Sequence, residues 1–175
     1  MSKRAIFLDR DGVINRVIMK EGKPYSPRKL SDCRLTDGIN DVLLRLKEDG
    51  FILIVVTNQP DISRGLIRWD ELNSIHDLIR SELPIDDIIV CPHDNDDNCA
   101  CRKPKPGMIV ESARKWGIDI AGSFLFGDTW KDMGAGEKAG CTTILLDAPY
   151  NQDVKSNHRI KNISEALEII IKKES

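Results

Sequence analysis

The 175-residue chain lacks several features that would point to a membrane or nucleic-acid function. No apolar run reaches the roughly 18 residues that a membrane-spanning helix requires, and the first residues do not resemble a signal peptide. Basic residues are not in excess, because 26 Lys and Arg are balanced by 28 Asp and Glu, for a net charge of −2. The chain therefore lacks the excess of basic residues whose attraction to phosphates dominates nucleic-acid binding. We expect neither a membrane nor a nucleic-acid partner.

Cysteine is also scarce, and its count of five is odd. Three of the five, Cys91, Cys99 and Cys101, fall within one short segment that also contains His93. An odd count argues against a disulfide framework, whereas three thiolates and one imidazole are a typical tetrahedral zinc set. We expect one zinc-binding loop with a structural Zn²⁺ ion, in a protein of the reducing cytoplasm. Inert reduced cysteines in a loop are the alternative.

What the chain does have is a regular alternation of short apolar runs and amphipathic segments. The apolar runs, each typical of a buried strand, are 5–8, 51–56, 88–90, 124–126 and 143–147. The segments between them carry apolar residues at helical spacing. This alternation predicts an α/β fold, a doubly wound, Rossmann-like parallel sheet with helices on both faces. The length predicts a single domain, residues 1–175, with no room for a large cap domain.

Polar residues follow these predicted strands, at the points where each apolar run ends. They are Asp9 and Asp11, then Thr57 and Asn58, then the Cys/His segment with Lys103, then Asp128 and Asp132. The carboxyl ends of parallel strands meet at one edge of a sheet, so these side chains are expected to converge. Paired carboxylates bind a hard cation or divide the roles of nucleophile and proton donor, although ordinary turns use the same residue types.

Four ordered segments resemble the motifs of the haloacid dehalogenase superfamily: Phe7-Leu8-Asp9-Arg10-Asp11-Gly12, Thr57-Asn58, Lys103 and Gly127-Asp128. The resemblance implies a Mg²⁺-dependent phosphatase in which Asp9 attacks phosphorus to form an aspartyl-phosphate, with Asp11 as general acid and base. It also implies that Mg²⁺ is held by Asp9, the Asp11 backbone carbonyl and Asp128.

The resemblance gives roles to the remaining candidates too. Thr57, Asn58 and Lys103 are expected to steady the transferred phosphoryl group. Asp132 is expected either to support the metal shell or to cap the helix that follows Asp128.

The cysteine loop that runs into Arg102 and Lys103 resembles a cap-less branch of the superfamily that contains heptose bisphosphate and histidinol-phosphate phosphatases. This resemblance implies a monomer acting on a small phosphorylated substrate, with the 7-phosphate of D-glycero-D-manno-heptose 1,7-bisphosphate ahead of histidinol phosphate or another small phosphomonoester. Arg64 and Arg102 are the side chains expected to contact the substrate, by forked hydrogen bonding.

Two other functions remain open from the sequence. A zinc-stabilised binding module would explain the cysteines, but it has no need for three acids and a Lys at successive strand ends. A nucleic-acid 3′-phosphatase of the same superfamily would need bases to stack on aromatic side chains. Helical spacing places Trp69 and Trp116 on the buried faces of their expected helices, which disfavours this second alternative.

Overall fold

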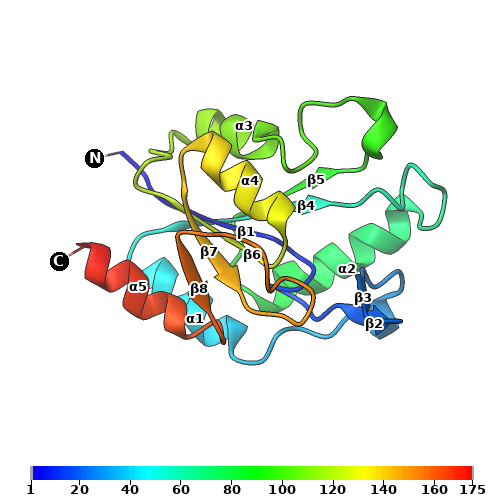
Figure 1. Cartoon of the computed structure of the whole chain (residues 1–175), viewed down its shortest axis with the longest axis horizontal. Coiled ribbons are helices and arrows are strands. Elements are labelled where there is room, and N and C mark those ends of the chain that lie inside the picture. Colours follow the sequence, from blue (N-terminus) through cyan, green and yellow to red (C-terminus); the bar gives the residue numbers. More distant parts are fainter. Residues whose placement is uncertain (1, 175) are drawn as a thin grey trace.

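Six parallel strands form the central sheet of the protein, a computed structural model that describes residues 2–174 (Figure 1). Their spatial order is β5 (Asp87–Cys91), β4 (Ile52–Asn58), β1 (Ala5–Leu8), β6 (Phe124–Gly127), β7 (Thr142–Leu146) and β8 (His158–Ile160). The order of the strands along the chain reverses between β1 and β6. In doubly wound sheets, ligands bind at the carboxyl ends of the strands beside this reversal.

The central strands are apolar because both of their faces are covered. All four residues of β1 are buried, and consecutive side chains of a strand point to opposite faces. Ile6 and Leu8 contribute to one hydrophobic cluster, whereas Phe7 contributes to the other. A strand of this kind reads as a continuous apolar run, which is why the sequence identified it.

Helices cover the two faces as the alternation predicts (Figure 1). The first face, which packs on Ile6 and Leu8, is covered by α1 (Ile39–Glu48), α2 (Trp69–Glu82) and α5 (Glu165–Glu174). The second face is covered by α3 (Gly107–Trp116) and α4 (Trp130–Ala139). The doubly wound α/β architecture is therefore confirmed. Within residues 2–174, no helix is long and apolar enough to cross a membrane.

Several short elements were not expected from the sequence. They are strand β8, the antiparallel hairpin β2 (Ile18–Lys20) and β3 (Lys23–Tyr25), and the 3₁₀ helices η1 (Leu30–Asp32) and η2 (Asn95–Asp97). Each has only three residues, too few for a period to show, and β3 contains Pro24. The expected burial of Trp69 was wrong: its side chain opens α2 but is 48% exposed.

Candidate active site

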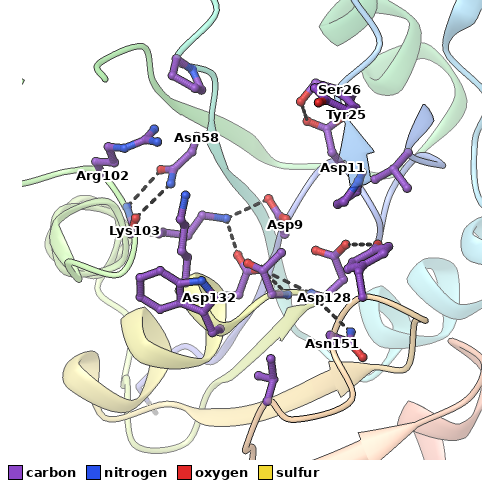
Figure 2. A pocket seen from close by; sticks show the side chains of 18 residues that line it. Asp9, Asp11, Tyr25, Ser26, Asn58, Arg102, Lys103, Asp128, Asp132 and Asn151 are labelled. Atoms are coloured by element: carbon purple, nitrogen blue, oxygen red, sulfur yellow. Dashed lines mark hydrogen bonds and ion pairs between the residues drawn. The ribbon is translucent and has the colours of Figure 1, made fainter. Parts of the chain in front are cut away.

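Carboxylates from neighbouring strands lie side by side where the strand order reverses. Asp9 directly follows β1 and Asp128 directly follows β6, and the backbone N–H of Asp9 donates to the Phe126 carbonyl at 2.9 Å. Asp132 reaches the same place from the first turn of α4. All three are buried, with one oxygen from each lying within 4.8 Å of the others (Figure 2). The predicted meeting of these acids is observed.

Lys103 is the one cation within hydrogen-bonding distance of this acidic cluster among the described residues. Its Nζ donates to Asp9 Oδ1 at 2.8 Å, to Asp132 Oδ1 at 2.6 Å and to the Val56 carbonyl at 2.7 Å. Burial alone lowers the pKa of Lys103, but the charges of Asp132 and Asp9 raise it above its usual value. The ammonium is therefore charged and holds Asp9 in a fixed position.

One ammonium does not balance three carboxylates. Burial raises the pKa of Asp9 to about 7, and the charge of Asp132 adds to this effect while Lys103 opposes it. Burial and the charge of Asp9 likewise raise the pKa of Asp128. A divalent cation placed among these oxygens would relieve the repulsion between the acids, which adds to burial in raising both pKa values.

The immediate surroundings of Asp128 also fit a cation. Its Oδ1 is buried, and no donor in the described part of the chain reaches it. Its Oδ2 packs against Gly12, where an added Cβ would lie only 2.0 Å away, and the backbone of Gly12 has a φ of 92°. Position 12 therefore requires glycine for two reasons: its backbone has a positive φ, and Asp128 leaves no space for a Cβ atom. An unpaired oxygen within an acidic cluster suits Mg²⁺, which prefers oxygen ligands.

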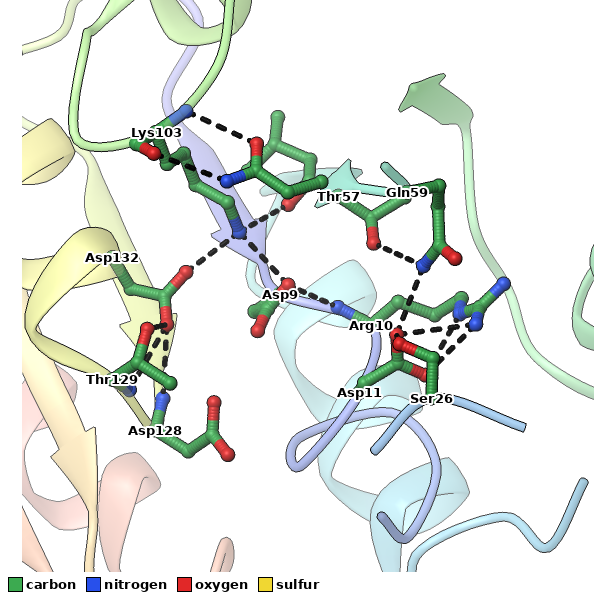
Figure 3. Close-up of polar contacts among 12 residues, drawn as sticks. Asp9, Arg10, Asp11, Ser26, Thr57, Gln59, Lys103, Asp128, Thr129 and Asp132 are labelled. Carbon is green, nitrogen blue, oxygen red and sulfur yellow. Dashed lines mark hydrogen bonds and ion pairs between the residues drawn. The ribbon is translucent and has the colours of Figure 1, made fainter. Parts of the chain in front are cut away.

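Asp11 lines the same pocket, but its carboxylate is not part of the acidic cluster (Figure 3). It accepts hydrogen bonds from Arg10 Nη2 at 2.9 Å, Asn15 Nδ2 at 3.0 Å, Ser26 Oγ at 2.7 Å and Gln59 Nε2 at 2.9 Å. Burial alone raises the pKa of Asp11, but the Arg10 charge and these hydrogen bonds bring it below its usual value. The Asp11 carboxylate is thus occupied by protein donors, and the expectation that Asp11 binds Mg²⁺ through its backbone carbonyl stays a prediction.

Thr57 and Asn58 lie at the end of β4, as expected, but both already have protein partners. The Asn58 side chain donates to the Lys103 carbonyl at 3.1 Å and accepts from the Lys103 backbone N–H at 3.0 Å. The Thr57 hydroxyl, which is buried, accepts from Gln59 Nε2 at 2.9 Å. Asn58 thereby fixes the backbone from which Lys103 extends toward Asp9.

Asp132 caps the helix that follows Asp128, which is one of the two roles considered for it, and it also contacts Lys103. Its Oδ2 accepts from the Thr129 hydroxyl at 2.7 Å and the Thr129 backbone N–H at 3.0 Å, in a capping box that starts α4. Its Oδ1 accepts from Lys103 within the acidic cluster. Asp132 therefore links the start of α4 to the charged centre.

A cavity of about 390 Å³ opens above the acidic cluster. Polar residues form its floor, and exposed aromatic residues stand at its edge: Tyr25 from β3 and Trp130 from α4. Arg102 and Lys131 bring positive charge to one side. The cavity can thus hold a small anionic molecule with a less polar part, which is the shape of a phosphorylated metabolite.

The predicted zinc ligands, Cys91, His93, Cys99 and Cys101, also come together. Cys91 Sγ lies 3.6 Å from His93 Nδ1, 3.6 Å from Cys99 Sγ and 3.1 Å from Cys101 Sγ. The separation of Cys91 and Cys99 is near the roughly 3.8 Å between sulfur ligands of a tetrahedral site with Zn–S bonds of about 2.3 Å, whereas that of Cys91 and Cys101 is shorter. The donor set fits Zn²⁺, and with four protein ligands such a site is closed.

The two candidate arginines differ in their placement. Arg102 lines the cavity but is mostly buried, and its guanidinium donates to Asn95 Oδ1 at 2.9 Å and the His93 carbonyl at 3.1 Å. Arg64 is not among the residues that line the cavity. It donates to both oxygens of Asp94, at 2.6 Å and 2.9 Å. Both arginines therefore hold the cysteine loop, and the structure does not bring Arg64 to the acidic cluster.

Other residues of the site were not identified from the sequence. All of them hydrogen-bond to Asp11 or Asp128: Arg10, Ser26, Gln59, Tyr150 and Asn151. Arg10 is fully buried between its neighbour Asp11 and His76. A buried Arg cannot be recognised from a local pattern, because exposed arginines occur in the same context.

Comparisons with known proteins agree with this geometry. The family described as HAD-hydrolase-like matches residues 100–164. The D-glycero-beta-D-manno-heptose-1,7-bisphosphate 7-phosphatase of Bordetella bronchiseptica is 36% identical over 148 residues, covering 82% of this chain and 80% of the relative. The D-glycero-alpha-D-manno-heptose-1,7-bisphosphate 7-phosphatase of Campylobacter jejuni is 31% identical over 179 residues, with 99% of each chain covered.

A solved structure of the same kind of enzyme is also similar. The D,D-heptose 1,7-bisphosphate phosphatase of B. bronchiseptica, complexed with magnesium and phosphate, is 28% identical and superposes with a TM-score of 0.84 over 97% of this chain and 99% of that one. Fold and site together define a phosphatase of the HAD hydrolase superfamily. The chain belongs, within that superfamily, to the family of the heptose-1,7-bisphosphate 7-phosphatases.

Proposed function

We propose that this phosphatase removes the 7-phosphate of D-glycero-D-manno-heptose 1,7-bisphosphate through an aspartyl-phosphate intermediate on Asp9. The observation that carries the proposal is the position of Asp9, buried at the floor of the cavity and held by Lys103 beside Asp128. Relatives that match 80% or more of their own length are named for this reaction. Some of them are named for the alpha anomer and others for the beta anomer.

In the first chemical step, a carboxylate oxygen of Asp9 forms a bond to phosphorus while the bond between phosphorus and the sugar oxygen breaks. Asp11 supplies the proton to the departing sugar oxygen. This role requires the Asp11 carboxyl to carry a proton when substrate is bound, whereas in the free protein Arg10 and its hydrogen-bond donors hold its pKa below the usual value. In the second step, Asp11 takes a proton from water, which attacks phosphorus and releases phosphate and free Asp9. Lys103 keeps the Asp9 carboxylate in line and contributes positive charge beside the transferred group.

Asp9, Asp128 and the backbone carbonyl of Asp11 would hold Mg²⁺, with Asp132 supporting the arrangement through Lys103. Bound there, Mg²⁺ would neutralise charge on the phosphoryl oxygens. The unpaired Oδ1 of Asp128 and the magnesium complex of the similar B. bronchiseptica enzyme support this assignment. Thr57 and Asn58 act on the phosphoryl group indirectly, since both are engaged by Gln59 and Lys103.

The cysteine loop would carry one structural Zn²⁺ on Cys91, His93, Cys99 and Cys101. Arg102 and Lys103 directly follow the last ligand, and the backbone N–H of Arg102 donates to Cys99 Sγ at 3.4 Å. Zinc would thereby fix Arg102 at the substrate and Lys103 at Asp9. Four protein ligands leave no open coordination position, so this ion shapes the loop.

The remaining parts of the proposal concern the whole chain. Residues 1–175 act as a single domain and a monomer, without a nucleic-acid or membrane partner, in the cytoplasm. The single main sheet that joins strands from Ala5 to Ile160 supports one domain. Reduced thiols, which zinc ligation requires, are maintained in the cytoplasm.

The test is phosphate release from the two anomers of heptose 1,7-bisphosphate, from histidinol phosphate and from a 3′-phosphorylated oligonucleotide, each with and without Mg²⁺. We expect the highest kcat/KM for one heptose anomer and no turnover without Mg²⁺. A higher kcat/KM for histidinol phosphate or the oligonucleotide would assign a different substrate, and turnover independent of Mg²⁺ would contradict the metal site.

A further inference from the structure

The segment that follows β7 passes beside the acidic cluster and contacts Asp128 at two points (Figure 2). The Tyr150 hydroxyl donates to Asp128 Oδ2 at 2.5 Å. The next residue, Asn151, is buried and donates from Nδ2 to the Asp128 backbone carbonyl at 2.7 Å. Both the side chain and the backbone of Asp128 are therefore held by one short segment.

This segment is itself held in place by Arg159 from β8. The Arg159 guanidinium donates to Asn151 Oδ1 at 3.2 Å, to the Asn151 carbonyl at 3.1 Å and to the Val154 carbonyl at 2.8 Å. Asn151 also donates to the Leu146 carbonyl at 2.9 Å, at the end of β7. Tyr150 thus extends from an anchored backbone, and its hydroxyl has a defined position relative to Asp128.

The two oxygens of Asp128 are consequently not equivalent. Oδ2 accepts from Tyr150 and packs against Gly12, whereas Oδ1 is buried without a donor. Turning the plane of the carboxylate away from this orientation would break the Tyr150 hydrogen bond. The hydrogen bond therefore fixes the orientation of the Asp128 carboxylate, and with it the position of the oxygen that is left for a cation.

We propose that Tyr150 is a positioning residue for the metal site: it holds Asp128 through Oδ2 so that Oδ1 is presented to Mg²⁺. The inference rests on the magnesium site of the proposed function and adds a residue that lies 22 positions away in the sequence. Groups that hydrogen-bond to a metal ligand orient it, and their removal typically weakens metal affinity or activity by about 10- to 100-fold.

The test compares Tyr150→Phe with Tyr25→Phe. Tyr25 lines the same cavity, and its hydroxyl makes no hydrogen bond within the described residues, so it is a matched control. Zinc-replete protein is freed of Mg²⁺ by gel filtration, and its unfolding midpoint is recorded against Mg²⁺ concentration, since a ligand that binds the folded state raises that midpoint. No substrate is present, so the result does not depend on whether the assigned substrate is correct.

We expect Tyr150→Phe to need about tenfold more Mg²⁺ for the same rise in the unfolding midpoint. Tyr25→Phe should respond as the unchanged protein does. The unfolding midpoint of each variant without Mg²⁺ checks that the fold is retained. With the preferred substrate, the Mg²⁺ concentration for half-maximal activity should rise by a similar factor, while kcat at saturating Mg²⁺ changes much less.

An unchanged Mg²⁺ response of Tyr150→Phe would overturn the proposal, and so would an equal loss in Tyr25→Phe. A Mg²⁺ response that is absent from the unchanged protein as well would instead contradict the magnesium site itself. Loss of turnover with a normal Mg²⁺ response would place the role of Tyr150 elsewhere than in holding Asp128.

Discussion

The two clusters of side chains that could hold a metal ion lie at the same edge of the sheet, yet they are built in opposite ways. The acidic cluster of Asp9, Asp128 and Asp132 is buried under a cavity, and one of its oxygens has no protein partner. The Cys/His cluster joins the buried Cys91 at the end of β5 to three partly buried side chains of the following loop, and the four potential ligand atoms lie within 4.8 Å of one another. Incomplete ligation leaves room for substrate, whereas complete ligation leaves none.

This difference predicts that the acidic cluster serves the reaction, whereas the Cys/His cluster serves the stability of the fold. Substitutions in the acidic cluster should remove activity with little loss of stability, because its charges repel one another in the folded protein. Substitutions in the Cys/His cluster should remove stability and zinc, and activity only through Lys103.

Asp9→Asn should lower phosphate release by at least about 10³-fold, because the amide cannot replace the attacking carboxylate. Burial and the charge of Asp132 disfavour the Asp9 anion, so the unfolding midpoint without Mg²⁺ should not fall. Asp37→Asn, at a side chain that is 87% exposed, is the control and should retain full activity. If the activity of Asp9→Asn were near that of the control, Asp9 could not be the nucleophile and the acidic cluster would have no role in the reaction.

Cys99→Ser should no longer bind one zinc ion per chain. Because the loop from Cys91 to Cys101 then loses its cross-link, the free energy of unfolding should fall by about 2–3 kcal/mol. Metal analysis of the freshly purified protein and urea unfolding provide the two readouts. Cys33→Ser, at a buried cysteine outside the cluster, should keep its zinc. A Cys99→Ser protein with normal stability but no activity would reverse the assignment of the two clusters.

The surroundings of the acidic cluster should also respond to pH. His76 lies buried against Arg10, with Nε2 and Nη1 3.2 Å apart, and burial together with the Arg10 charge lowers the pKa of His76 to about 3. An unfolded His titrates near 6.5. The unfolded chain therefore gains a proton below about pH 6.5 that the folded protein does not bind, and stability decreases as the pH falls toward 3.

This loss should approach about 1.4 kcal/mol per pH unit for the one proton. Urea unfolding at pH 7 and pH 5 tests it by comparing the unchanged protein with His76→Gln, in which the pH dependence should be weaker by this amount. His158→Gln, at an exposed His of β8, serves as the control. The same pH dependence in all three proteins would show that His76 is not buried as a neutral group.

The smallest effect is expected at the cavity edge. Trp130 and Trp69 each open a helix and are 58% and 48% exposed, but only Trp130 is among the cavity-lining residues. Stacking of a sugar on an indole at about 0.5–1.5 kcal/mol corresponds to a rise in KM of about two- to tenfold in Trp130→Ala. Trp69→Ala should leave KM unchanged. Equal KM values in both variants would exclude stacking at this edge.

The parts that could be predicted from the sequence depend on local patterns. Continuous apolar runs identified five of the six strands of the main sheet. The acids at the strand ends were identifiable because the architecture itself brings strand ends together. The three-residue strands β2, β3 and β8 have no such pattern.

The parts that could not be predicted depend on contacts between distant segments. Tyr150 reaches Asp128 across 22 residues, and Gln59 reaches Asp11 across 48. Asn58 was expected at the phosphoryl group, but its amide holds the backbone of Lys103, 45 residues away. Arg64 was expected at the substrate and holds Asp94 of the cysteine loop. A sequence motif therefore identifies the residues of a site more reliably than it identifies the partner that each residue contacts.

The most direct test of the central claim is to trap the covalent intermediate on Asp9. The enzyme is quenched in acid during turnover of its preferred substrate, reduced with borohydride, which converts an aspartyl-phosphate to homoserine, and digested for mass spectrometry. The account predicts homoserine at position 9 and at no other acid, and none when substrate is omitted. Homoserine at position 11 or 128 instead would contradict this prediction. An unmodified Asp9 in an enzyme that is saturated with substrate when it is quenched would also contradict it.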